Sequence, residues 1–245
     1  MSDPRQDSPF SEIPPTGEPT GPTEPTEPVR PGDPRPESEA VPAGIPWETR
    51  LSEDPLGATW QTWRESVFSP DSFYRALPPR GGWLPALGYL VLFSIIGAFF
   101  SLIWSLAFSG IAVRAGEGAE AGLSPVAEAF LSFFITPFAA VLGVFLIGGL
   151  YHLLLMLMNA AGGGYRGTVR VLCYAAGPVV FGIVPILGNL VATVWWVVLA
   201  IVGLRNVHRT DTWKAAVAVL VPVALLMLIT IFAVIAAVAV GLMVL

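Results

Sequence analysis

The chain has 245 residues, of which 54% are hydrophobic and only 13% are charged, and its mean hydropathy is +0.67. Soluble domains carry nearer a quarter of charged residues, so this composition argues against a soluble enzyme or a nucleic-acid-binding protein and indicates an integral membrane protein. The net charge of −5 is unevenly placed, because residues 1–55 hold twelve acidic and four basic side chains and the remainder holds six acidic and nine basic ones.

Residues 1–55 are predicted to form a disordered, acidic, cytoplasmic tail. Thirteen of the 23 prolines lie in residues 1–46, and apolar residues are few and scattered there. Such a segment buries too little surface to offset its ordering entropy, and it favours local polyproline II structure. The tail is either a solvated spacer or a binding segment for a partner domain.

Residues 56–82 are predicted to form short amphipathic helices. Leu56, Trp60, Trp63 and Val67 recur at helical spacing and define one apolar face. The stretch FSPDSF then favours a second helix, with Ser69 as its N-cap and proline at the first helical position. Because tryptophans and arginines precede the first apolar run, we expect these helices to lie in the membrane interface, to pack on the helical bundle, or both.

The remainder, residues 83–245, is predicted to be an all-α integral membrane bundle of five transmembrane helices. The expected spans are about 83–108, 130–158, 169–186, 189–207 and 213–240.

The third and fourth spans share one charge-free run, 171–204, which must contain a turn. Pro185 is expected to end the third span, Gly188 to take positive φ as a helix stop and Asn189 to cap the return helix. The Gly177–Pro178 pair is expected to kink the third span. The alternative is a re-entrant hairpin that does not cross the bilayer fully.

Basic residues favour one side of the membrane. Only Arg114 lies between the first two spans, and no basic residue follows the fifth. The positive-inside rule therefore predicts a multi-pass protein of the cell membrane, with a cytoplasmic N-terminus and a C-terminus outside. The basic cytoplasmic face is expected to comprise Arg75, Arg80, Arg166, Arg170, Arg205, His208, Arg209 and Lys214.

Candidate chemistry is sparse. None of the five apolar cores contains Asp, Glu, Lys or Arg, and His152 is the one titratable side chain expected within the membrane. We interpret it as a structural hydrogen-bonding residue, and His208 as solvated. The single cysteine, Cys173, excludes an internal disulfide and a cysteine-cluster metal site. The sequence thus predicts no catalytic residue, no cofactor and no metal, and we expect a protein that is not an enzyme.

The stretch from YHLLLMLMNAAGGGYRG to LRNVHRTDTWKAA resembles the Yip domain family, and FSPDSFYRALP resembles the segment before the first span in bacterial members. The resemblance covers roughly residues 66–230 and implies a five-span bundle with a cytoplasmic N-terminus. Eukaryotic members contact Rab-type GTPases and carry a DLYGP-type motif near the first span, where this chain has RALPPRGGW, so the resemblance does not extend to GTPase binding. The resembling positions are His152, Gly162, Gly163, Gly164, Thr168, Tyr174, Pro178, Pro185, Gly188, Trp195, Gly203, His208, Lys214, Ala215 and Pro222.

Two hypotheses follow for function. The first is a non-enzymatic membrane organiser or adaptor, whose partners are the lipid bilayer and a membrane-protein partner or a second copy of the chain. The second is a channel or permease for a neutral or lipidic substrate, with Pro178 and His152 beside the path.

Overall fold

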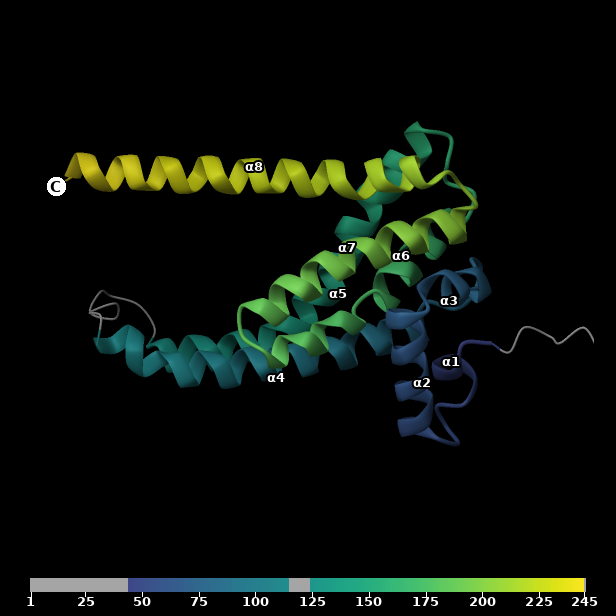
Figure 1. Cartoon of the computed structure of the whole chain (residues 1–245), viewed down its shortest axis with the longest axis horizontal. Coiled ribbons are helices and arrows are strands. Elements are labelled where there is room, and N and C mark those ends of the chain that lie inside the picture. The colour runs from purple at the N-terminus through teal and green to yellow at the C-terminus, as the bar shows by residue number, and fades with distance from the viewer. Residues whose placement is uncertain (1–43, 115–123, 245) are drawn as a thin grey trace, which may run out of the picture. The chain divides into compact units, whose positions relative to one another are not determined.

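The computed structural model describes residues 44–114 and 124–244. Helices are the only regular secondary structure among these residues (Figure 1). Residues 1–43 of the predicted disordered tail lie outside the described residues. The elements are α1 (Pro46–Thr49), α2 (Pro55–Phe68), α3 (Pro70–Ala76), α4 (Leu84–Arg114), α5 (Pro125–Leu157), α6 (Gly164–Tyr174), the 3-10 helix η1 (Gly177–Ile183), α7 (Leu187–His208) and α8 (Thr212–Val244).

Four of these helices, α4, α5, α7 and α8, are long and apolar enough to cross a membrane. They correspond to four of the five predicted spans, and the five-span count is not confirmed. The predicted third span, residues 169–186, does not form a single helix, because α6 ends at Tyr174 and a 3-10 helix begins at Gly177. Pro178, which lacks a backbone N–H and would clash with the preceding turn, occupies the start of η1, where that defect is tolerated.

The chain reverses between η1 and α7, but not through the residues that the sequence indicated. Ile186 is the N-cap of α7 and has a positive φ of 63°. Gly188 and Asn189 lie in the first turn of α7, so the predictions of positive φ at Gly188 and of an Asn189 cap are wrong. Gly188 is needed for close approach instead, since a Cβ there would lie 1.8 Å from the carbonyl oxygen of Phe181.

The short helices α1, α2 and α3 pack against the larger helices. Within α2, Leu56 and Trp60 are 84% and 61% exposed, whereas Ala58 and Thr62 are buried. Of the apolar face expected for α2, Val67 is therefore packed, whereas Leu56 and Trp60 are exposed. The reason is α1, which lies inside the segment predicted as tail: its Trp47 is buried, and the Trp47 backbone N–H donates to Thr62 Oγ1 at 2.9 Å.

Three polar contacts hold the end of α2 against α4, η1 and α7. Trp63 Nε1 donates to the Gly177 carbonyl at 2.9 Å, and Trp195 Nε1 donates to the Val67 carbonyl at 2.9 Å. The hydroxyl groups of Ser66 and Tyr89 lie 3.4 Å apart. These contacts place α2 beside the first turns of α4, and Figure 1 shows α2 running across the direction of the long helices.

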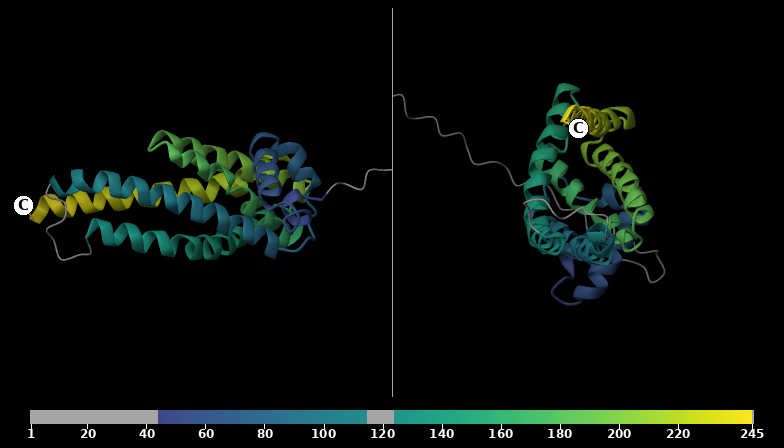
Figure 2. Two further views of the ribbon diagram at one scale, coloured as in Figure 1. Left: turned by 90° about the horizontal axis from the view of Figure 1, so that it is seen from below. Right: turned by 90° about the vertical axis from the view of Figure 1, so that its left-hand side faces the viewer.

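The long helices differ in how much of their length packs against other helices. Helices α4 and α5 run side by side, whereas α8 contacts α5 and α7. The buried residues of α8 are confined to its first turns, at Ala215, Ala218 and Val219. Figure 2 shows α8 and α4 extending well beyond the turn between η1 and α7. The hairpin of η1 and α7 is therefore shorter than the helices around it.

Candidate functional site

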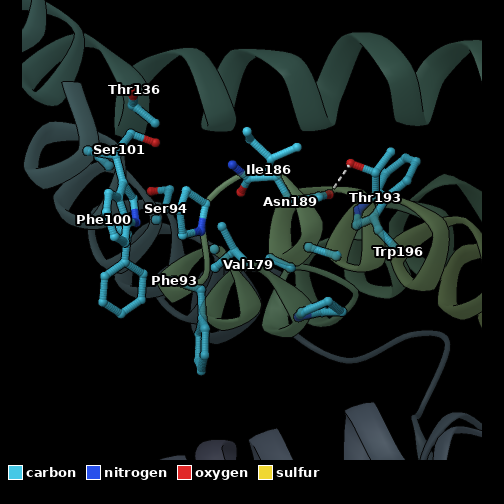
Figure 3. Close-up of a pocket in the computed structure, with 18 of the residues that line it drawn as sticks. Phe93, Ser94, Phe100, Ser101, Thr136, Val179, Ile186, Asn189, Thr193 and Trp196 are labelled. Carbon is cyan, nitrogen blue, oxygen red and sulfur yellow. Dashed lines mark hydrogen bonds between the residues drawn. The ribbon is translucent and has the colours of Figure 1, made fainter. Parts of the chain in front are cut away.

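The main cavity lies between α4, η1 and α7, with one residue from α5 (Figure 3). Its volume is about 910 Å³, within the range of ligand-binding pockets. Along α4, its lining runs from Leu90 to Phe108, and on the hairpin it includes Pro178, Pro185 and Asn189. Three of the five predicted hairpin and kink residues therefore line this cavity, while Gly177 and Gly188 do not.

Three of the five hydroxyl groups that line the cavity are bonded within their own helices. Ser94 Oγ donates to the Val91 carbonyl at 2.8 Å, and Thr136 Oγ1 donates to the Ser132 carbonyl at 2.7 Å. Thr193 Oγ1 donates to the Asn189 carbonyl at 2.8 Å, the contact drawn as a dashed line in Figure 3. These bonds occupy the donors of Ser94, Thr136 and Thr193, and the remainder of the lining is mainly apolar.

The lining of the cavity provides hydroxyl groups but no carboxylate, imidazole, thiol or amine that could act as a general acid or base. Its lining holds no charged residue, histidine or cysteine. The cavity can accommodate an apolar ligand through dispersion contacts with Phe93, Phe100 and Trp196. Its lining holds no side chain that titrates near neutral pH and could transfer a proton.

Arg170 is not part of a cytoplasmic surface. Its side chain is fully buried and forms an ion pair with Glu48 of α1, while its guanidinium also donates to the Pro78 carbonyl. The Tyr174 hydroxyl donates to the same Glu48 oxygen at 2.6 Å. The predicted surface role of Arg170 is wrong because its side chain is buried between the Pro78 carbonyl and the Glu48 carboxylate of α1.

His208 is also buried, at 3% exposure, and the expectation that it is solvated is wrong. Its Nδ1 accepts from the Gly163 backbone N–H at 3.1 Å, and its Nε2 lies 2.9 Å from Thr168 Oγ1. The same hydroxyl lies 3.1 Å from Nδ1 of His152. A chain of hydrogen bonds thus joins α5, α6 and α7, consistent with the interpretation of His152 as a structural residue.

Other basic residues form a mixed-charge cluster at the junction of α3, α7 and α8. Asp71 forms ion pairs with Arg75 and Arg205. A hydrogen bond from Asn206, followed by the charges of Arg75 and Arg205, lowers the pKa of the Asp71 carboxyl. This part of the predicted basic face is therefore partly neutralised by an acidic residue that the charge count passed over.

The remaining basic residues have separate surroundings. Lys214 lies 3.9 Å from Asp211, and the Arg166 guanidinium lies 5.9 Å from the centre of the Trp83 ring. Arg80 and Arg209 make no ion pair with another described residue. No cluster of potential metal ligands occurs among the described residues.

Sequence reasoning missed Glu48 and the cavity. Glu48 lies in a proline-rich, acidic segment, and its partner is 122 positions further along the chain, so no local pattern marks it. The signal available was the pair of aromatic and apolar residues around it, Ile45 and Trp47, which interrupt an otherwise polar tail.

Comparison with known proteins gives one match. The family model described as Yip1 domain matches residues 64–242, which is more than half of the chain. No curated protein and no solved structure matches.

Proposed function

Because the chain belongs to the Yip1 domain family and is a multi-pass membrane protein, we propose that it is a non-enzymatic membrane organiser that inserts asymmetrically into the bilayer. Helices α4, α5 and α8 cross the bilayer. The hairpin of η1 and α7 enters from the cytoplasmic side and turns within it, the alternative that the sequence left open. The observation that carries this proposal is the level at which α2 packs.

The contacts of α2 mark one level on both α4 and α7, from which the depth of each helix in the bilayer can be compared. The α2 helix meets α4 at Tyr89 and α7 at Trp195. At a rise of 1.5 Å per residue, α4 extends about 30 Å from Tyr89 to Ser109, which equals the hydrocarbon thickness of a bilayer. By the same rise, α7 extends only about 12 Å from Trp195 back to its start at Leu187. With α2 in the interface, the turn at Ile186 then lies near the middle of the bilayer.

Exposure along α7 supports the same placement. Ile186, Leu187, Leu190, Val191 and Val194 are all exposed apolar residues near the turn. From Leu199 to His208, α7 contributes the buried residues Leu199, Ala200, Gly203, Leu204, Val207 and His208, under cover of protein. The exposed apolar residues near Ile186 suit contact with lipid chains, and the protein-covered segment from Leu199 to His208 suits the membrane interface.

This arrangement is wedge-shaped across the membrane. The cytoplasmic leaflet holds five helices, η1 and α7 in addition to α4, α5 and α8, and the opposite leaflet holds three. The exposed Leu56 and Trp60 of α2 add apolar insertion at the cytoplasmic surface. Insertion into one leaflet is sensitive to membrane curvature, so such a protein gathers in, or produces, membrane that is convex toward the cytoplasm.

Charge supports the orientation. Eight basic residues, at positions 64, 75, 80, 166, 170, 205, 209 and 214, lie on the proposed cytoplasmic side, and Arg114 alone, the last residue of α4, lies at the opposite end. This division is the same for five crossings as for three crossings plus a hairpin. It supports a cytoplasmic N-terminus and a C-terminus outside. Since Arg170 is buried, seven of the eight remain for contact with anionic headgroups.

The second hypothesis, a channel or permease for a neutral or lipidic substrate, is not favoured by the surroundings of His152. The cavity lining is mainly apolar and holds no charged residue, a composition that suits a lipidic ligand without indicating that the ligand is transported. His152, the residue expected to face a transport path, does not line it and is bonded to Thr168 instead.

The test is reconstitution of the full chain into vesicles of uniform size, with imaging of membrane shape as the protein-to-lipid ratio rises. We expect smaller or tubular vesicles, and a weaker effect for the Leu56→Ser/Trp60→Ser double variant. The matched control is Val238→Ser, an exposed apolar position on α8. Vesicles that keep their shape at every ratio would overturn the proposal.

A further inference from the structure

We propose that the cavity between α4 and the η1–α7 hairpin is a binding site for one hydrocarbon chain of a bilayer phospholipid. This inference uses the multi-pass placement of the chain but is independent of whether the protein deforms membranes. Three features of the cavity support it: its shape, its lining and its surroundings.

The cavity is extended along α4, which suits a chain rather than a compact solute. The lining residues of α4 run from Leu90 to Phe108, which is about 27 Å of helix at 1.5 Å per residue. The opposite wall is formed by η1 and the first half of α7, including Val179 and Trp196. The wall formed by α4 is therefore longer than the wall formed by the hairpin, and Figure 3 shows side chains of α4 on one side of the cavity and Ile186, Asn189, Thr193 and Trp196 on the other.

The lining suits a chain without charge. Aromatic and aliphatic side chains dominate it, and the Ser94, Thr136 and Thr193 hydroxyls already donate to backbone carbonyls. An ionised ligand would lose its hydration there without an ionic partner, because the lining holds no charged residue. A methylene chain has no hydrogen bonds to lose on entering, and it gains dispersion contacts with the lining.

The bilayer around the cavity is the source of the bound hydrocarbon chain. The cavity lies among helices that cross the membrane, and the residues at its margins, Ile186 and Phe108, are exposed apolar side chains. In a bilayer, the matter that meets these residues is lipid. Because Ile186 and Phe108 at the margins of the cavity are exposed, a chain enters from the side, between α4 and the turn at Ile186.

The experiment uses the full chain in nanodiscs made with a phosphatidylcholine that carries a photoreactive diazirine on one acyl chain. After illumination, peptide mapping compares labelling of the groove residues of α4 with labelling of the lipid-exposed half of α8. We expect at least fivefold more label at the groove. The Ala192→Phe variant, which fills the groove from α7, should reduce groove labelling to the α8 level and leave α8 labelling unchanged.

Two controls keep the result interpretable. Ala237→Phe makes the same substitution on the exposed part of α8 and should leave groove labelling intact. Ser101→Ala changes a lining hydroxyl without filling space, and it should also leave labelling intact because the chain needs no donor there. Equal labelling of groove and α8 in the wild-type protein, or undiminished groove labelling in a folded Ala192→Phe variant, would overturn the proposal.

A second arm distinguishes the chain from its headgroup. Competition with unlabelled phosphatidylcholine and with phosphatidylglycerol of the same chain length should reduce groove labelling equally. A preference above tenfold for the anionic lipid would mean that the headgroup, and not the chain, determines binding, and would contradict the site as proposed. Neither outcome depends on vesicle shape, so failure of this site is distinguishable from failure of the organiser proposal.

Discussion

The buried ion pair between Arg170 and Glu48 allows the sharpest stability prediction. Arg170 is enclosed by the Pro78 carbonyl and by Glu48, which also accepts from Tyr174. Replacing Glu48 with Ala leaves a positive charge buried without a carboxylate. Loss of one partner from a buried pair costs about 3–5 kcal/mol, or between roughly two and four orders of magnitude in the ratio of folded to unfolded protein.

The assay is equilibrium unfolding of the full chain in mixed micelles, followed by tryptophan fluorescence. Trp47 reports on release of α1, because its ring packs edge-on against Tyr89 with a centroid distance of 5.7 Å. The double variant Glu48→Leu/Arg170→Met removes both charges and should cost much less than Glu48→Ala alone.

The control for this prediction is an exposed ion pair of the same kind. The side chains of Arg75 and Asp71 are 66% and 45% exposed, so Arg75→Ala should cost less than about 1 kcal/mol. If Glu48→Ala costs no more than Arg75→Ala, then Arg170 reaches water in the native protein and the account of α1 as a structural cap is refuted.

Three further predictions concern the turn, the histidine and the aspartate. Gly188→Ala should destabilise the protein by about 1–3 kcal/mol in the same unfolding assay, since the new Cβ meets the Phe181 carbonyl oxygen, and unchanged stability would contradict the close approach. His208→Ala should cost about 1–3 kcal/mol by leaving the buried Gly163 N–H without its acceptor, whereas His208→Asn should recover part of this loss. The lowered pKa of Asp71 means that its contribution to stability is complete at neutral pH and is lost as the pH falls through the folded-state pKa. Asp71→Asn should therefore be less stable than wild type at pH 7, and the difference should shrink at pH 3.

The sequence predicted the elements whose signal is local. Apolar runs of sufficient length identified α4, α5, α7 and α8, and proline after Ser69 correctly marked the start of α3. The family resemblance was also confirmed, since the Yip1 domain match covers residues 64–242. These features depend on composition and short-range spacing, which a single sequence displays directly.

The sequence could not predict the features that depend on distant partners. The run around Pro178 is apolar enough for a span, but its first part is an amphipathic helix whose buried arginine requires Glu48, a residue of the proline-rich segment. Likewise, the burial of His208 depends on Gly163 and Thr168 of another helix. The cavity arises from the tertiary arrangement of α4 and the hairpin, and its serines and threonines resemble ordinary packing residues.

The placement of the η1–α7 turn within the bilayer is tested most directly by accessibility at Ile186. In a Cys173→Ser background, Ile186→Cys is treated with a membrane-impermeant maleimide in intact and in permeabilised cells, with Ser124→Cys at the start of α5 as the outside reference. The predicted result is labelling of Ser124→Cys in intact cells and no labelling of Ile186→Cys from either side. Labelling of Ile186→Cys from outside, at the rate of the reference, would mean that α7 crosses the membrane fully and would contradict the proposed insertion.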